Sequence, residues 1–234
     1  MAPTTIERSL VSDQVFRILC ADLVSGRYEP GERLPTQRTL AADLDVNMAS
    51  IREAVKRLEQ LRLVESRQGE GMRVRDWRRN GGLDVLAPLM LRAGGLDRET
   101  FSAVLEARRL MLAEAASLAA GRAAPDQAKQ LVALAQRIAE APDAAAAQAL
   151  DFAFFSELLD AAGNVVFVLI MNSIRELYFQ HAEAFRPLLA EHVALAPLYR
   201  RAAKAIAAAD AARAAGAVRR IAEAQEASLL ESLA

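Results

Sequence analysis

Hydrophobic residues recur at helical spacing between residues 36 and 61, and the pattern predicts two short helices joined by a turn. In the first, over 36–44, Thr36 is placed to cap the helix. In the second, over 47–61, Asn47 is the capping residue and the apolar residues recur at steps of four, three and three. This spacing predicts that one face of the second helix is buried, through Ile51, Val55, Leu58 and Leu61.

The opposite face of the second helix carries small, polar or cationic side chains. Short side chains let the start of a helix approach base edges in the major groove of DNA, and an arginine can bind guanine through two hydrogen bonds or hold a phosphate. The pattern therefore predicts a helix that reads DNA, with Asn47, Ala49, Ser50, Arg52 and Lys56 outward.

A β-hairpin is predicted directly after this helix. Apolar and polar residues alternate over 63–67 and again over 72–75, on both sides of a turn that contains Gly69 and Gly71. We expect its tip to be cationic and to reach the adjacent minor groove or the DNA backbone. Two helices, a turn and a wing in this order predict a winged helix-turn-helix domain over 1–76.

The remainder of the chain predicts a second, all-helical domain. A polar segment with two glycines, 77–82, is the expected linker, and beyond it the sequence is rich in alanine and apolar at helical spacing. We expect no strand in 83–234 and assign that range to ligand binding and dimerisation. The fold class is therefore mainly α, with bundle helices expected over 83–92, 98–122, 125–140, 143–161, 165–185, 188–208 and 210–232.

The distribution of charged residues supports DNA binding by the first domain. The chain of 234 residues has a formal net charge of −1, yet residues 33–79 hold 11 Lys and Arg against 7 Asp and Glu. The excess of positive charge therefore lies where DNA would be read. Because that excess is small, we expect a homodimer on double-stranded operator DNA, which doubles the contacts.

Several other classes of protein are disfavoured by the sequence. A single cysteine, Cys20, forms no internal disulfide, and we expect it to be a buried apolar residue. No signal peptide and no apolar run long enough to span a bilayer is found, so we expect a cytoplasmic protein without a membrane partner. With two histidines, no Ser-His-Asp set, no phosphate loop and no dinucleotide fingerprint, we expect neither an enzyme nor a cofactor.

The first domain resembles the DNA-binding domain of the GntR family of bacterial repressors, through GRYEPGERLPTQRTLAADLDV from Gly26, IREAVKRL from Ile51 and RQGEG from Arg67. Two residues depart from the family pattern: Met48 stands where an operator-contacting Arg is usual, and Gln37 where Glu is usual. One lost guanidinium contact costs about 1–3 kcal/mol of base discrimination, so we expect an unusual operator. The resemblance completes the predicted DNA-binding set: Thr36, Arg38, Asn47, Met48, Ala49, Ser50, Arg52, Lys56, Gln68 and Gly69.

The second domain resembles the effector domain of the FadR subfamily, through EARR at 106–109, LAA at 118–120 and AGN at 162–164. Most members of that subfamily hold a divalent metal with one Asp and three His. Here Asp151 is in place, but Phe155, Arg200 and Ile221 stand at the His positions. One carboxylate does not make a zinc site, so we expect no metal.

The apolar replacements favour a ligand with a hydrocarbon part. The resemblance to the metal-free fatty-acid regulator of the subfamily implies an acyl-CoA or another amphipathic acid. Its anionic end is expected at Arg108, Arg175 and Arg200. The full predicted ligand-binding set is Arg108, Asp151, Phe155, Asn172, Arg175, Phe179, Arg200 and Ile221.

The expected mechanism is a ligand-driven population shift. Two recognition helices of a homodimer would enter successive major grooves, and the ligand would change the separation or freedom of the winged domains and so relieve repression. Two alternatives remain open, a DNA-binding dimer with no small-molecule effector and a sensor of a small carboxylate.

Overall fold

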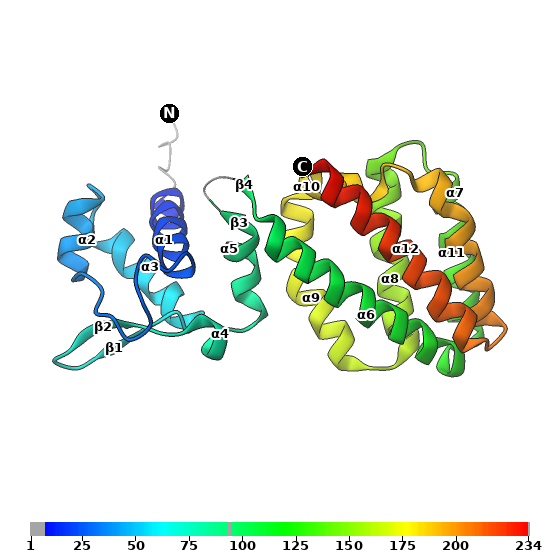
Figure 1. Ribbon diagram of the computed structural model, residues 1–234, viewed down its shortest axis with the longest axis horizontal. Helices are drawn as coiled ribbons and strands as arrows, with labels where there is room; N and C mark the ends of the chain where they lie inside the picture. The colour runs from blue at the N-terminus through cyan, green and yellow to red at the C-terminus, as the bar shows by residue number, and fades with distance from the viewer. Residues whose placement is uncertain (1–7, 93–94, 234) are drawn as a thin grey trace, which may run out of the picture. The chain divides into compact units, whose positions relative to one another are not determined.

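The computed structural model describes residues 8–92 and 95–233, which belong to two compact units, Met1–Asp97 and Arg98–Ala234 (Figure 1). Residues 1–7 of the predicted first domain and residue 234 of the second lie outside the described residues. Within the described part the chain is mainly helical, which confirms the predicted fold class.

Three helices form the core of the first unit: α1 (Arg8–Val24), α2 (Gln37–Asp43) and α3 (Met48–Gln60). The inner face of α3 packs against α1, where Cys20 is completely buried, as predicted. The three helices bury one apolar cluster, so the outer face of α3 stays free for another partner. The members of this cluster on α1 and α3 are Val15, Phe16, Leu19, Cys20, Leu23, Val24, Ile51, Ala54, Val55 and Leu58.

The predicted wing is present as strands β1 (Val64–Arg67) and β2 (Gly71–Val74), which pair antiparallel. The register places Val64 opposite Val74 and Arg67 opposite Gly71. An isolated bridge between Arg33 and Arg73 ties the loop before α2 to the hairpin. The wing is therefore anchored on the side of β2 as well as through β1.

The segment after the wing differs from its sequence-based assignment. Residues 77–82, expected to be a free linker, begin with a helical turn capped by Asp76, and Trp77 packs against the N-terminal core. Val85 and Leu89, expected in the second domain, also belong to that core, and the helix that carries Leu89, α5 (Leu86–Met90), lies on α1. The expectation of no strand beyond residue 82 was wrong. The elements here are α4 (Trp77–Asn80), η1 (Leu83–Val85), α5 (Leu86–Met90), β3 (Leu91–Arg92) and its antiparallel partner β4 (Gly95–Leu96).

The second unit is a bundle in which α12 packs on α6 and α11, α11 packs on α7, and α8 packs on α6 and α7 (Figure 1). Its centre is lined by small and aromatic side chains, many of them completely buried. The elements are α6 (Arg98–Arg122), α7 (Pro125–Ala139), α8 (Ala144–Ala162), α9 (Val165–Gln180), α10 (Ala182–Phe185), η2 (Arg186–Leu189), α11 (His192–Ala207) and α12 (Ala211–Ser232).

Two boundaries in the bundle differ from the expected ranges. The helix expected over 165–185 is interrupted at His181, whose backbone leaves the helical region at φ −117° and ψ 34°. Pro197, by contrast, lies inside α11 without ending it. A proline removes the hydrogen bond to the carbonyl four residues earlier, here that of Val193, which is 66% exposed and can be solvated.

Within the described residues, no helix combines the length and the apolar character that crossing a bilayer requires.

Candidate DNA-reading surface and ligand site

The two short helices of the first unit begin at side-chain caps, as their sequences predict. Thr36 Oγ1 accepts a hydrogen bond from the Thr39 amide at 3.1 Å, and Asn47 Oδ1 accepts one from the Ser50 amide at 2.9 Å. Each cap satisfies a backbone donor that the helix leaves unpaired. The caps thus fix where α2 and α3 begin, and with that which residues of α3 point outward.

The outer face of α3 presents the side chains expected to contact DNA, with one exception. Met48, Ala49, Arg52 and Lys56 are exposed, whereas Ser50 is 7% exposed and packs inward. On α2, Arg38 is exposed as well. For the three cations of this set, no ion pair with another described residue is found, so they are free to bind phosphate or base edges.

The wing tip differs from the expected cationic hairpin. Arg67 pairs with Glu65 at 2.6 Å, and Arg73 pairs with Glu70 at 2.9 Å while donating to the Gly31 carbonyl at 2.8 Å. The exposed tip is left to Gln68 and Gly69, both in the predicted set. Gly69 has φ +78°, a conformation that favours glycine. The tip therefore offers an amide and backbone groups to DNA more than free charge.

In the helical unit, four elements bring a polar cluster into the core. Asp151 of α8 is 3% exposed, and its Oδ1 accepts hydrogen bonds from the Tyr199 hydroxyl of α11 and from Gln225 Nε2 of α12, the latter at 2.9 Å. Arg108 of α6 donates to Gln225 Oε1 at 2.8 Å and lies 3.8 Å from Asp151 Oδ2. Its guanidinium carbon lies 4.9 Å from the centre of the Phe155 ring. We call these four polar residues and Phe155 the Arg108 centre.

Burial dominates the electrostatics of the Arg108 centre. Desolvation raises the pKa of Asp151 above its ordinary value, and the Arg108 charge and the hydrogen bonds from Tyr199 and Gln225 oppose that rise. Burial and the Asp151 charge raise the pKa of Tyr199, so its hydroxyl stays protonated and can donate. Tyr178 is also buried, and burial and the Asp151 charge raise the pKa of its hydroxyl above its ordinary value.

The predicted ligand residues divide into two groups. Arg108, Asp151, Phe155 and Ile221 lie inside the bundle, with Ile221 completely buried one turn before Gln225. The other predicted residues are exposed: Asn172, Arg175 and Phe179 on α9, and Arg200 on α11.

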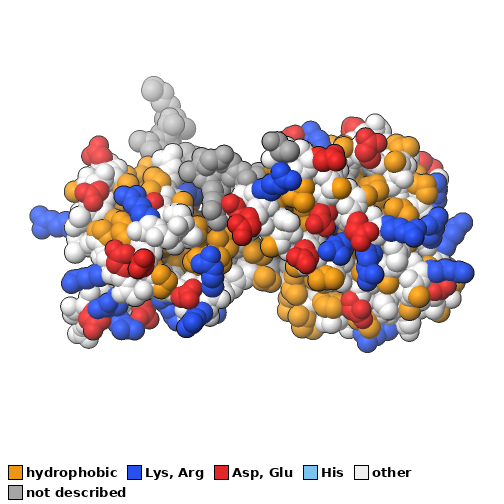
Figure 2. Space-filling view, viewed as in Figure 1, with side chains coloured by type: hydrophobic (Ala, Val, Ile, Leu, Met, Phe, Trp, Pro, Cys, Tyr) orange, Lys and Arg blue, Asp and Glu red, His pale blue; other side chains and the backbone are white. Residues whose placement is uncertain are grey.

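The surface of α9 is apolar around its predicted residues. Val165, Val166 and Leu169 are more than half exposed, and hydrophobic side chains gather where α9 runs (Figure 2). Phe179 meets the Phe152 ring at 4.8 Å between centroids, and Arg175 lies 5.2 Å from the same ring. Arg175 and Phe179 therefore lie beside Phe152, and neither takes part in the hydrogen bonds of the Arg108 centre.

The expected position of Arg200 requires correction, because Tyr199 is the residue of α11 that contacts Asp151. Sequence reasoning missed both Tyr199 and Gln225. Tyr199 adjoins the predicted position, and Gln225 follows Ile221 by four residues, the spacing that places two side chains on one helix face. The sequence positions of Tyr199 and Gln225 could therefore have indicated that both lie near Asp151.

The side chains around Asp151 do not fit a divalent metal. Asp151 is surrounded by Arg108, Tyr199 and Gln225, and the other expected ligand positions hold Phe155 and Ile221. A cation adjoining the carboxylate opposes a second cation there, and zinc needs nitrogen, sulfur or several oxygen donors. Across 8–92 and 95–233, no group of three His, Cys, Asp or Glu is found that could hold a metal ion.

Comparison with known proteins gives matches to both units. Residues 11–74 match the family described as Bacterial regulatory proteins, gntR family, and residues 103–224 match the FCD domain. The HTH-type transcriptional regulator Mce2R of Mycobacterium tuberculosis is 35% identical over 210 residues, 90% of this chain and 88% of the relative. A fatty acid metabolism regulator protein of Edwardsiella ictaluri is 29% identical over 163 residues, 68% of this chain and 66% of that protein.

A solved structure of Lar, which controls the expression of the Listeria monocytogenes agr system, has a TM-score of 0.50 at 16% identity, and the match covers 94% of each chain. At this level of identity the match shows a shared fold.

Proposed function

The chain belongs to the GntR family of DNA-binding transcriptional regulators and carries an FCD effector domain, and we propose that it is a homodimeric repressor controlled by an amphipathic acid. A fatty acyl-CoA is the representative ligand of this class. The proposed site of control is the Arg108 centre of the helical unit. Repression is the proposed sign of regulation, and the cell interior the proposed location.

The proposed contacts with the operator follow from the exposed face of α3. Arg52 and Lys56 would meet phosphate or base edges, Met48 and Ala49 would lie against bases, and the tip of the wing would approach the neighbouring backbone. Met48 offers no hydrogen-bond donor, so we expect an apolar contact, such as one with a thymine methyl group, at its base pair.

The observation that carries the effector proposal is the buried cation of the Arg108 centre. The Arg108 side chain is 14% exposed, in contact with an aromatic ring, and an acid that enters the bundle would compete with Asp151 for it. Because the Edwardsiella relative is a fatty acid metabolism regulator, fatty acyl compounds are the first to test.

A second candidate function is an effector-free DNA-binding dimer. It is favoured by the hydrogen bonds that Asp151 already receives from Tyr199 and Gln225, since a filled centre needs no ligand for its stability. A sensor of a small carboxylate is a third candidate, because the same guanidinium would bind any carboxylate.

The test begins with the full-length chain and a library of random double-stranded DNA, from which the bound operator is selected and sequenced. Release of that operator is then followed by fluorescence anisotropy with acyl-CoAs of graded length and with small dicarboxylates, each with and without zinc. We expect release that strengthens with acyl length and weakens in Arg108→Gln, with Arg219→Ser as a matched surface control.

Each other outcome identifies an alternative. Release by small dicarboxylates alone would establish the small-acid sensor. Operator binding that no compound alters would establish the effector-free dimer. Absence of any selected operator would overturn the DNA-binding proposal itself.

A further inference from the structure

A groove runs along the surface between α7 and α11, away from the polar contacts of the Arg108 centre. It has a volume of about 810 Å³ and begins where α6 ends, at Ala120 and Ala123. Its length along α7, from Pro125 to Gln136, corresponds to about 16 Å of helix. The volume lies within the range of small-molecule sites, about 300–1,000 Å³.

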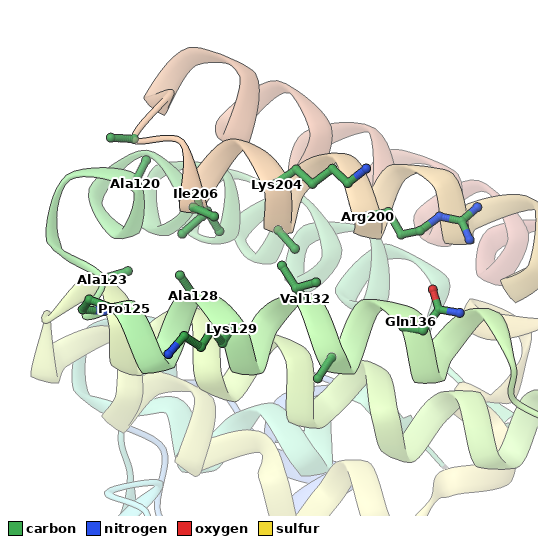
Figure 3. Close-up of a pocket in the computed structure, with 14 residues that line it drawn as sticks. Ala120, Ala123, Pro125, Ala128, Lys129, Val132, Gln136, Arg200, Lys204 and Ile206 are labelled. Atoms are coloured by element: carbon green, nitrogen blue, oxygen red, sulfur yellow. The ribbon is translucent and has the colours of Figure 1, made fainter.

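The floor of the groove is apolar because both helices place small or branched side chains along their common seam. Residues of α7 that line it recur at helical spacing, and those of α11 face them (Figure 3). Val132 stands out as a large apolar side chain that is 41% exposed there. Alanine leaves the space that larger residues would fill. The apolar lining comprises Ala120, Ala123, Pro125, Ala128, Val132, Ala133, Ala203, Ile206, Ala207 and Ala209.

Cations border the groove on both helices, but Lys129 of α7 is paired with Asp126 at 3.0 Å. Arg200 and Lys204 project from α11 into view in Figure 3. The same two residues also line an adjoining cleft of about 430 Å³, together with Arg201 and Arg213. Lys and Arg side chains gather on the side of the bundle where α11 lies (Figure 2). Among the described residues that line the two hollows, Asp210 is the acid present, and it caps α12 and pairs with Arg213 at 3.3 Å.

Arg200, Arg201 and Lys204 form no ion pair with any residue of 8–92 or 95–233. Arg200 and Lys204 are four residues apart on one helix, a spacing at which like charges destabilise a helix slightly. Lys204 lies in the last turn of α11, where a cation stabilises the end of the helix, but Arg200 lies about two turns earlier and gains no such benefit. An anion placed between Arg200 and Lys204 would remove the repulsion between their charges. Because the whole protein has a net charge of −1, this group of unpaired cations is a local feature of α11.

We propose that this groove is a second ligand site, and that it takes a single-chain amphiphile with a phosphate-bearing head. The hydrocarbon chain lies on the alanine floor between α7 and α11. The phosphate lies at Arg200 and Lys204, with Arg201 at the mouth of the adjoining cleft. The aliphatic stems of Arg200 and Lys204 cover the first part of the chain. This site goes beyond the proposed function, since it does not require the Arg108 centre to bind anything.

The charge pattern distinguishes this ligand from others. A neutral lipid would leave the free cations unused, and inorganic phosphate would leave the apolar floor exposed. A carboxylate carries one charge, whereas a phosphate monoester carries nearly two at neutral pH and has three acceptor oxygens, which suits several cations on one helix.

The test is calorimetric titration of the full-length protein with decyl phosphate below its micelle concentration. Inorganic phosphate, decanoate and decyl maltoside serve as comparison compounds. We expect decyl phosphate to bind more tightly than any of the three. The double variant Arg200→Ser/Lys204→Ser should weaken it by about tenfold or more, given the strength of hydrogen bonds to charged groups.

Three further variants locate the binding. Val132→Asn changes an exposed residue of the floor and should reduce the dependence on chain length without unfolding the bundle. Arg219→Ser/Arg220→Ser removes two exposed cations of α12 that do not line the groove and should leave affinity unchanged. Arg108→Gln should retain decyl phosphate binding, which separates the groove from the Arg108 centre.

Specific results would overturn the proposal. Equal weakening by the α12 control would show binding to general positive charge, and loss in Arg108→Gln would place the ligand in the core. Binding to vesicles that contain phosphatidylglycerol, without binding of monomeric decyl phosphate, would mean that the groove contacts a membrane surface and not a single amphiphile.

Discussion

Replacing Arg108 with methionine is the perturbation that tests the Arg108 centre most directly. Methionine keeps much of the length and apolar character of the stem but removes the guanidinium. The hydrogen bond to Gln225 at 2.8 Å, the attraction to Asp151 at 3.8 Å and the contact with the Phe155 ring are all lost. Asp151 would then remain in the core with a side chain that is 4% exposed and no neighbouring cation.

The expected loss follows from what Asp151 keeps. Removing one partner of a buried ion pair typically costs 3–5 kcal/mol of unfolding free energy. Here Asp151 retains hydrogen bonds from Tyr199 and Gln225. We therefore expect Arg108→Met to lower the free energy of unfolding by about 3 kcal/mol, the lower end of that range. Most of the cost comes from the stranded carboxylate. The double variant Arg108→Met/Asp151→Asn should therefore be more stable than the single variant Arg108→Met.

The two units offer separate signals for this measurement. Trp77 is the single tryptophan of the chain and packs against the core of the first unit, so its fluorescence reports that unit. Circular dichroism at 222 nm reports chiefly the longer helices of the second. In urea at pH 8, we expect Arg108→Met to lower the midpoint of the dichroism transition and to leave that of the fluorescence transition in place.

The reasoning would be refuted by a dichroism midpoint that does not change, because a charge buried without its partner must cost stability. It would also be refuted if the double variant were no more stable than Arg108→Met, since the stranded carboxylate would then not be the source of the loss.

Three further outcomes are expected. Burial raises the pKa of Asp151 above its ordinary 3.8, so its contribution to the free energy of unfolding is complete below pH 3.8 and is lost as the pH rises through the raised pKa. In urea titrations at a series of pH values, the free energy of unfolding should fall less with rising pH in Asp151→Asn than in the unchanged protein. Asn47→Ala removes the cap of α3 and should cost about 1 kcal/mol by Trp77 fluorescence. Burial raises the pKa of Cys20 to about 12, so a thiol reagent should label it only on unfolding, and fast labelling of the native protein would contradict its burial.

Sequence alone predicted the first unit well because its signals are local. The caps at Thr36 and Asn47 and the period of the α3 core lie within a few residues of the features that they specify. The packing of Val85 and Leu89 on the N-terminal core was not predictable in this way. A short amphipathic segment between two domains can bury its apolar side against the core of either domain, and its sequence does not say which. The ion pairs of Arg67 with Glu65 and of Arg73 with Glu70 were missed for a similar reason, because these side chains meet only in the folded hairpin.

In the second unit, the sequence located Asp151 and Phe155 but placed Arg200 where Tyr199 lies. One residue on a helix corresponds to a rotation of about 100°, enough to move a side chain from core to surface. The alanine-rich stretch around α11 offers few large side chains that would fix the orientation of the helix. The phenol of Tyr199, large and able to donate to a buried carboxylate, identifies the inward position once Asp151 is known to be buried.

The alanine seam between α7 and α11 has a mechanical consequence. Long side chains interlock across helix pairs, so one helix can move along another only if rotamers change. Ala128 and Ala207 have no rotamers to change, and the seam that they line presents low ridges to a helix moving along it. A short slide of α11 along α7 would therefore meet little side-chain interlocking at this seam. Because Tyr199 lies on α11, such a slide would change its hydrogen bond to Asp151.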